Sequence, residues 1–220
     1  MRVVSLWSGG KDSCFACYQA KSRGHKIVSV FNFVNPQRAS LSHGLSAEII
    51  QRQLAAVDIL FLQKSMPKEG YRQAFMKLIN EWKIQKGIGA IVFGDIYLQE
   101  HKDWIDKVCD ELKVKAILPL WGKDTRRLIA EIIGAGFKAI VVSTRADLLG
   151  PEWLGRQIDE EFIKEIKALG NIDLCGERGE YHTFVYDGPL FKKPVEFITG
   201  KKLLKDNRWF LKLLPKEEAR

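Results

Sequence analysis

Short apolar stretches alternate with helical stretches along the first half of the chain, and this alternation constrains the fold more than any other feature. The strand-like stretches lie at residues 2–7, 26–34, 58–63, 89–93 and 114–118. The helical stretches between them lie at residues 14–23, 47–56, 68–86 and 103–112. Strands joined by helices of this length form βαβ units with a mostly parallel sheet. Right-handed crossovers then bring the carboxyl ends of the strands to one edge, where open α/β sheets bind ligands.

The second half of the chain has a looser pattern. Helical spacing recurs at residues 124–135 and 159–169, a strand-like run lies at 137–143, and β character returns over 184–214. This order predicts a smaller α+β region beside the parallel sheet. The sequence therefore predicts an α/β fold with two domains, at residues 1–122 and 123–220.

The composition is that of a globular protein, with 46% hydrophobic and 28% charged residues among 220. No apolar run reaches the ~20 residues of a membrane span, and the amino-terminal residues do not form a secretion signal. Four cysteines are too few to form a disulfide scaffold in a chain of 220 residues, which indicates a reducing compartment. We therefore expect a cytoplasmic protein with no membrane partner.

The net charge of +8 raises the question of nucleic-acid binding. Residues 191–220 carry nine of the 35 basic and four of the 27 acidic side chains, so most of the excess lies at the end of the chain. Lysines in such a segment protect exposed strand edges, or they form a docking surface for a protein. Both interpretations stay open, and we expect no direct contact with nucleic acid.

The loop of residues 8–13, with the sequence SGGKDS, directly follows the first predicted strand. Its two glycines permit a tight turn and a close approach of the backbone to an anion. The N–H groups of the loop and of the next helix then face one point, and Lys11, which we expect to be exposed, adds a positive charge. An ordinary glycine turn with a capping Asp or Ser is the alternative. The strand–loop–helix context favours the anion site.

Two further polar segments are candidates for chemistry. Gly94 and Asp95 follow the fourth predicted strand on the same edge as the loop, where a carboxylate can hold magnesium or a substrate amine, although a simple turn has the same composition. Residues 175–183 (CGERGEYHT) combine two glycines with Glu177 and Glu180. Irregular polar segments often carry sites, although composition alone favours a solvated acidic turn.

Cys14 and Cys17 lie one helical turn apart and invite a metal or redox interpretation. Cys109 and Cys175 are single, so no second pair completes a zinc site. Packing of both thiols against the core is therefore the favoured interpretation.

Together these motifs resemble one protein family. SGGKDS resembles the pyrophosphatase loop of the N-type ATP pyrophosphatases, which cleave ATP between its α and β phosphates. The resemblance narrows to the diphthine–ammonia ligase family on Gly94-Asp95-Ile96, Pro119-Leu120-Trp121, Trp153-Leu154-Gly155 and GERGEYHT at 176–183. These matches run from residue 8 to residue 183 and cover most of the chain.

The resemblance implies a fold, a reaction and a site. The fold is the Rossmann-like domain of the adenine-nucleotide α-hydrolase type (HUP). The reaction is the ATP-dependent amidation of diphthine on translation elongation factor 2 by ammonia, through an acyl-adenylate, with release of AMP and pyrophosphate. ATP and Mg²⁺ are the implied cofactors, and a homodimer is left open.

The resemblance also assigns roles to individual residues. The ATP-binding residues that it implies are Ser8, Gly9, Gly10, Lys11, Asp12, Ser13, His43, Gly94 and Asp95. The implied catalytic residues are Lys11, Asp12, Glu177 and Glu180, and the implied metal contacts are Asp12 and Asp95. The aromatic faces that could meet a quaternary ammonium group belong to Trp121, Trp153 and Tyr181, each of which has a structural role as its alternative.

Two other functions stay open on the same fold. A tRNA-modifying ATP pyrophosphatase, for thiolation or lysidine-type ligation, would suit the basic charge, but thiolation needs a reactive cysteine system that is not evident in this chain. A non-catalytic ATP-binding module is the other alternative. Lys11 and Asp12 argue against it, because a simple nucleotide sensor does not need to hold pyrophosphate.

Overall fold

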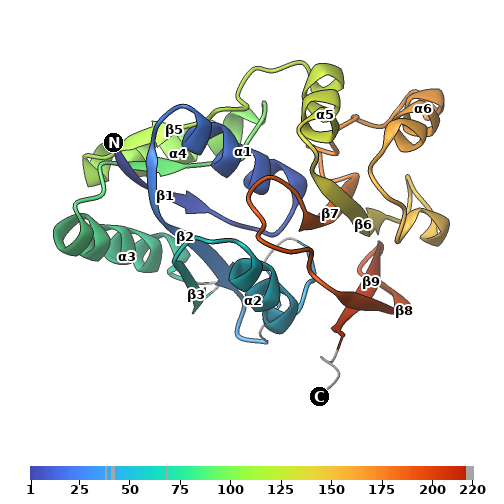
Figure 1. Ribbon diagram of the computed structural model, residues 1–220, viewed down its shortest axis with the longest axis horizontal. Coiled ribbons are helices and arrows are strands. Elements are labelled where there is room, and N and C mark those ends of the chain that lie inside the picture. Colours follow the sequence, from blue (N-terminus) through green and yellow to red (C-terminus); the bar gives the residue numbers. More distant parts are fainter. Residues whose placement is uncertain (38, 41–42, 68, 217–220) are drawn as a thin grey trace.

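The first part of the protein is a five-stranded parallel sheet with helices on both faces. The computed structural model describes residues 1–37, 39–40, 43–67 and 69–216. The strands are β1 (Arg2–Leu6), β2 (Lys26–Val34), β3 (Phe61–Ser65), β4 (Ala90–Val92) and β5 (Lys115–Ile117). The helices are α1 (Lys11–Ser22), α2 (Ala47–Ala56), α3 (Tyr71–Lys86) and α4 (Gln99–Leu112) (Figure 1). The predicted α/β fold is therefore confirmed.

The strand order places one change of winding direction at the centre of the sheet, between β1 and β4. The order is β3-β2-β1-β4-β5, and every neighbouring pair is parallel. The chain runs outward on one side from β1 and returns to the other side at β4. The carboxyl ends of β1 and β4 therefore flank the position where such sheets bind their ligands.

The alternation of β1 divides the core between the two faces of the sheet. Val3 faces the side covered by α1 and α2, and Val4 faces the side covered by α3 and α4. Val3 and Val4 are both fully buried, as expected for a parallel strand that helices cover on both faces. The sheet is thus a rigid platform for the loops at its edge.

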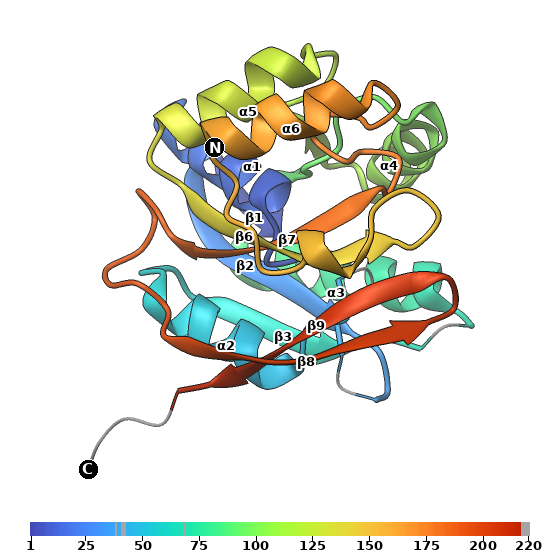
Figure 2. The same cartoon turned by 90° about the vertical axis from the view of Figure 1, so that its right-hand side faces the viewer.

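The second part of the protein is a four-stranded antiparallel sheet with two helices. Its elements are α5 (Thr125–Gly134), β6 (Lys138–Arg145), a 3-10 turn η1 (Pro151–Trp153), α6 (Glu160–Leu169), β7 (Tyr181–Asp187), β8 (Phe197–Lys205) and β9 (Arg208–Pro215). The strand order is β7-β6-β9-β8. Its buried side chains continue the core beneath α1 and α2, and the β8–β9 hairpin lies beside α2 (Figure 2). The predicted division at residues 122 and 123 falls in the connection between β5 and α5 and stays a prediction.

Several predicted element boundaries are wrong. α1 begins at Lys11 instead of residue 14, because Gly10 already acts as its N-cap. β3 covers Phe61–Ser65 instead of residues 58–63, because its pairing with β2 begins at Phe61. α4 begins at Gln99, four residues before the predicted start. The start predicted for α3 at Lys68 lies outside the described residues.

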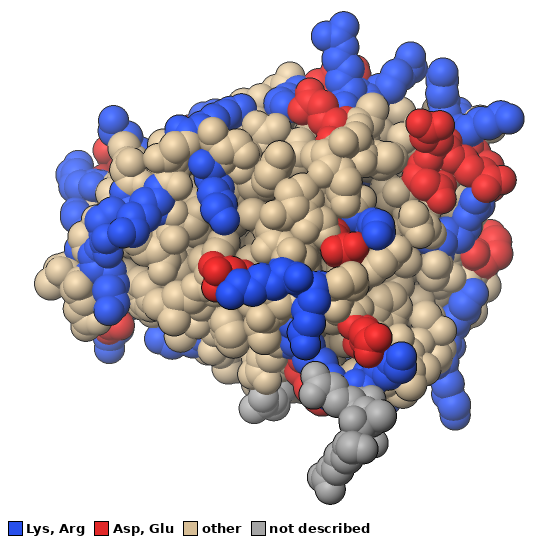
Figure 3. Space-filling model, in the orientation of Figure 1, with Lys and Arg blue, Asp and Glu red and all other residues tan. Residues whose placement is uncertain are grey.

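The basic carboxyl-terminal segment forms the β8–β9 hairpin, and β8 is an edge strand. Lys201, Lys202 and Lys205 are exposed on it, next to the exposed Leu203 and Leu204. On the face drawn in Figure 3, basic and acidic side chains are interspersed both around the periphery and across the centre. Lysines on an edge strand oppose pairing with other chains. Among the residues that the structure describes, none belongs to a helix long and apolar enough to cross a membrane.

Candidate active site

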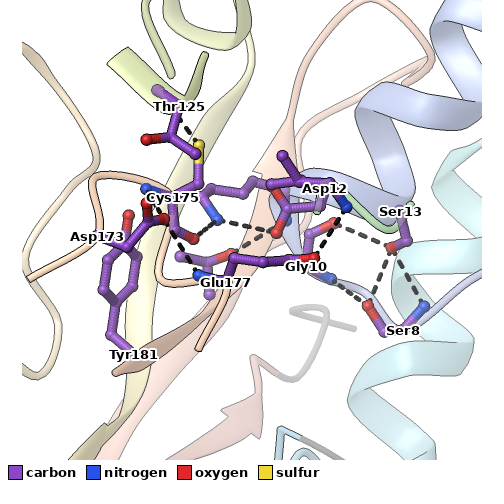
Figure 4. A network of polar contacts seen from close by, with 12 residues as sticks. Ser8, Gly10, Asp12, Ser13, Thr125, Asp173, Cys175, Glu177 and Tyr181 are labelled. Atoms are coloured by element: carbon purple, nitrogen blue, oxygen red, sulfur yellow. Dashed lines mark hydrogen bonds and ion pairs between the residues drawn. The ribbon is translucent and has the colours of Figure 1, made fainter. Parts of the chain in front are cut away.

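The loop of residues 8–13 folds tightly after β1 and is held by its own serines. Ser13 Oγ donates to the carbonyl of Gly10 (3.0 Å) and accepts from the N–H of Ser8 (3.2 Å). The two serine hydroxyls lie 3.0 Å apart, and Figure 4 shows this network at the start of α1. Because the N-cap residue is a glycine, no side chain of the loop itself caps the first helical turn, and the N–H of Lys11 donates to Thr183 Oγ1 (3.0 Å) instead. The loop is therefore built to accept an anion.

Close packing explains both glycines of the loop. Gly9 has φ +91°, and a Cβ at this position would lie 2.5 Å from Cδ1 of Ile50. A Cβ at Gly10 would lie 2.6 Å from Nε2 of His43. Close packing thus requires a glycine at both positions, and the part of Gly9 and Gly10 in ATP binding stays a prediction.

Lys11 is buried, with 2% of its side chain exposed, so the prediction of an exposed lysine is wrong. Its ammonium group donates to Asp12 Oδ2 (2.9 Å) and to the carbonyl of Cys175. It also lies 5.2 Å from the centre of the Tyr181 ring. The segment that precedes β7 covers Lys11, and this segment is more than 160 residues away along the chain.

Lys11 and Asp12 form a charged pair at the floor of the site. Burial disfavours the Lys11 ammonium, but Asp12, Tyr181 and Cys175 together outweigh that effect, and the pKa of Lys11 lies above its ordinary value. Burial raises the pKa of Asp12, and the Lys11 ammonium opposes that rise. Lys11 therefore carries a full positive charge at neutral pH.

One oxygen of Asp12 is available for a cation. Oδ1 is buried and has no hydrogen-bond partner within the described part of the chain. A buried carboxylate oxygen without a donor is unfavourable, and a Mg²⁺ ion would satisfy it. No group of three or more His, Cys, Asp or Glu converges on one point in the described residues. Mg²⁺ commonly uses one or two carboxylates and keeps waters and substrate phosphates as its other ligands, so these residues fit that ion.

Gly94 and Asp95 lie beside the loop, as predicted from the carboxyl ends of the strands. A Cβ at Gly94 would lie 2.9 Å from the backbone nitrogen of Ser13, so the chain passes directly against the start of α1. Asp95 Oδ1 lies 2.9 Å from Nδ1 of His101. Both residues line the same cavity as the loop.

The segment that precedes β7 is folded around the side chain of Asp173. Asp173 Oδ1 accepts the N–H of Cys175 (2.9 Å) and that of Glu177 (3.2 Å). Gly176, with φ +68°, permits the tight turn that this requires. The turn holds the carbonyl of Cys175 against Lys11, and Figure 4 shows Asp173, Cys175 and Glu177 at this turn. Asp173 belongs to no recognisable motif, and its only signal in the sequence is its place before the glycine-rich segment.

Glu177 bridges this segment to the end of β4. Its Oε1 accepts the backbone N–H groups of Ile96 (2.8 Å) and Tyr97 (3.4 Å). Burial raises the pKa of Glu177 to about 7, and the negative charges of Asp12 and Asp95 add to the rise. Glu177 is therefore close to half-ionised at neutral pH, which suits a group that exchanges a proton.

Glu180 lies behind the cavity wall instead of lining it. Only 3% of its side chain is exposed. Oε1 accepts the N–H of Asp173 (3.2 Å), and Oε2 is buried without a partner in the described residues. The structure thus places Glu180 where it supports the turn that carries Glu177.

One cavity of about 260 Å³ brings most of the predicted residues together. The predicted residues that line it are Ser8, Lys11, Asp12, Ser13, His43, Gly94, Asp95 and Glu177. His182 and Thr183 also line it, and the N–H of Lys11 donates to Thr183 Oγ1 (3.0 Å). Both belong to the GERGEYHT segment. The sequence pointed to the two glutamates of that segment as candidates and gave no role to His182 or Thr183.

The aromatic residues offered as ammonium-binding faces have other contacts. Tyr181 is buried beside Lys11, and its hydroxyl donates to the carbonyl of Leu174 (2.6 Å). Trp153 packs against Phe162 with 5.7 Å between ring centres. Both serve as core residues in this structure, in line with the structural alternative.

The four cysteines are buried and unpaired with one another. Burial raises the pKa of each thiol above its ordinary value. A thiol is a nucleophile only as a thiolate, so these side chains are poorly suited to sulfur transfer. This observation disfavours a thiolation enzyme.

Comparison with known proteins identifies the family. Residues 1–116 match the diphthamide synthase N-terminal domain, and residues 124–217 match the diphthamide synthase C-terminal domain. The chain belongs to the diphthamide synthase family.

Curated relatives carry one name. Diphthine–ammonia ligase of Danio rerio is 28% identical over 218 residues, which span 89% of this chain and 86% of that protein. Diphthine–ammonia ligase of Bos taurus is 29% identical, and the match spans 89% of this chain and 82% of the bovine protein. The Schizosaccharomyces pombe protein of the same name is 30% identical over 93% of this chain, although the match spans only 37% of the yeast protein.

Proposed function

We propose that this protein is a diphthine–ammonia ligase, which uses ATP to amidate the carboxylate of diphthine on translation elongation factor 2. The observation that carries the proposal is the cavity in which the SGGKDS loop of a diphthamide synthase family member meets Glu177. A tRNA-modifying enzyme on this fold is not favoured, because the curated relatives are ligases of one kind.

The first chemical step is transfer of AMP to the substrate. A carboxylate oxygen of diphthine attacks the α-phosphorus of ATP, the bond between the α-phosphorus and the bridging oxygen breaks, and pyrophosphate leaves. The loop with Lys11 stabilises the charge that develops on the pyrophosphate. Since Lys11 is fixed by Asp12 and by the carbonyl of Cys175, its charge is preorganised.

Mg²⁺ would be held by Asp12, whose Oδ1 has no partner in the described residues, together with Asp95. When bound, it would neutralise phosphate charge and hold the phosphate oxygens in a fixed arrangement. Asp12 and Asp95 would otherwise repel the polyphosphate. Asp95 is oriented by His101, which lies 2.9 Å from its Oδ1.

The second step forms the amide. The nitrogen of ammonia attacks the carbonyl carbon of the acyl-adenylate, AMP leaves, and the nitrogen loses a proton. Glu177 lines the cavity, and its pKa of about 7 lets it accept that proton at neutral pH. Glu180 positions the turn that carries Glu177 through its bond to Asp173.

The protein substrate would dock on the basic β8–β9 hairpin, whose lysines and leucines are exposed and whose strand β9 contacts α2. We place the reaction in the cytoplasm, where translation takes place. Light scattering of the purified protein decides between a monomer and the homodimer that the sequence left open.

The test is release of AMP and pyrophosphate from ATP in the presence of diphthine-bearing elongation factor 2. The proposal requires that release depends on both the modified protein and ammonia. Release that responds to tRNA and not to elongation factor 2 would overturn it. ATP binding without turnover under any of these conditions would favour a non-catalytic module.

A further inference from the structure

Two histidines face each other on one wall of the cavity. The ring centres of His43 and His182 lie 4.7 Å apart, with an angle of 52° between the rings. His43 comes from the connection between β2 and α2, and His182 is the second residue of β7. Both line the cavity together with Lys11. The two side chains therefore come from distant parts of the chain to one place.

Cations flank this pair of rings. Lys11 begins α1, and Arg208 begins β9. The Arg208 guanidinium is fixed by donation to Ser143 Oγ (3.2 Å) and to the carbonyl of Gly179 (2.5 Å). The charged groups that act on the two rings are these two cations and, for His182, the ring of His43. The carboxylates of Asp12, Asp95 and Glu177 line the same cavity, and none of them is among the causes of the pKa shift of either ring.

This environment keeps both rings neutral. Burial lowers the pKa of His43 to about 3, and Lys11 and Arg208 add to the effect. Burial also lowers the pKa of His182 well below its ordinary value, and His43, Arg208 and Lys11 act in the same direction. Lys11 is paired with Asp12, whereas Arg208 donates to neutral acceptors, so Arg208 leaves an excess of positive charge beside the two neutral imidazoles. An anion between them would reverse the effect on both rings and favour their protonation.

We propose that His43 and His182 form a proton-coupled phosphate site that takes up a proton when the pyrophosphate end of the nucleotide binds. This inference rests on the proposed function, because it assigns the polyphosphate to the same cavity. The bound phosphate oxygens accept N–H bonds from the imidazolium rings, and the proton comes from solvent. Release of pyrophosphate returns the proton, so product release is easier at higher pH.

Imidazole titration by nuclear magnetic resonance tests the proposal directly, because the chain has only four histidines. Single His→Gln variants assign each signal. In the free protein, the His43 and His182 signals should not titrate near pH 6.5, the ordinary range. Addition of inorganic pyrophosphate should move at least one titration midpoint upward by one pH unit or more. Binding of pyrophosphate with no change in either midpoint would overturn the proposal.

Affinity measurements give the second readout. The dissociation constant of pyrophosphate is measured by calorimetry from pH 8 to pH 6. Its pH dependence includes the protonation of pyrophosphate itself. His182→Gln removes one ring and leaves that ligand effect in place. His25→Gln is the matched control, since His25 follows the far end of α1.

Wild type and His25→Gln should gain affinity with falling pH more steeply than His182→Gln, by up to about tenfold per pH unit for each linked proton. Equal slopes for all three proteins would refute the phosphate site and leave the ligase function standing. Failure of pyrophosphate to bind to any of them would overturn this inference and the proposed ATP site together.

Discussion

Replacement of Lys11 by methionine removes the charge at the floor of the site and keeps the length of the side chain. The carbonyl of Cys175 then loses a donor in a buried place, which costs about 1–3 kcal/mol. Breaking a fully buried ion pair costs about 3–5 kcal/mol. Because Asp12 is 28% exposed, water can solvate its carboxylate in the variant, and the loss of the ion pair costs less than that. We expect a total near 3 kcal/mol, and a melting temperature lower by roughly 6–12 °C for a chain of this size.

The effect on the reaction should exceed the effect on stability. Loss of one preorganised donor to developing charge lowers a rate by about 100- to 1,000-fold. Release of AMP is measured well below the melting temperature of the variant, and thermal unfolding is followed by circular dichroism. Lys21→Met is the matched control, because Lys21 is exposed in the last turn of the same helix. A Lys11→Met protein with an unchanged melting temperature and a rate within threefold of wild type would refute this account of the loop.

The remaining predictions concern the residues around the loop. Glu177→Gln keeps an acceptor for the N–H groups of Ile96 and Tyr97, so the fold should persist. The rate of amidation should fall, and the acidic limb of the pH–rate profile near pH 7 should disappear. An unchanged profile would show that Glu177 takes no part in the proton transfer. The raised pKa of Glu177 means that its contribution to stability is present below about pH 4.5 and lost as the pH rises through about 7, so wild type should lose more stability than Glu177→Gln over that interval in urea titrations. Asp173→Ala should destabilise the protein by about 2–4 kcal/mol in urea unfolding through the loss of two backbone bonds, whereas Asp173→Asn should cost less than about 1 kcal/mol; equal costs would contradict the acceptor role. Gly94→Ala should raise the KM for ATP, because its Cβ would meet the backbone of the loop at 2.9 Å, and a normal KM would show that the loop can move aside.

The parts of the fold that sequence predicts well are those fixed by local signals. The helix at residues 47–56 was predicted with its exact bounds, and Ser46 caps it by accepting from the N–H of Ile49 (3.3 Å). The alternation of apolar strands and helices also sufficed for the parallel sheet. The start of α1 was missed because a glycine N-cap offers no side-chain signal.

The arrangement of the site depends on contacts that sequence reasoning cannot supply. Lys11 was expected in solvent, because nothing near it in the chain predicts that the carbonyl of Cys175 and the ring of Tyr181 will cover it. Glu180 was placed among catalytic groups by its motif, but whether it faces the cavity depends on the turn around Asp173. The resemblance to the family located the right segments, and the tertiary fold decided which side chains of each segment meet the cavity.

The central claim is that ATP cleavage at the loop drives amide formation on a protein. The most direct test counts products in one reaction: AMP and pyrophosphate by chromatography, and the amide on elongation factor 2 by mass spectrometry. The account predicts one AMP and one pyrophosphate for each amide formed, with amide formation about 100- to 1,000-fold slower in Lys11→Met. Formation of ADP and phosphate in place of AMP and pyrophosphate, or amide formation without ATP cleavage, would contradict it.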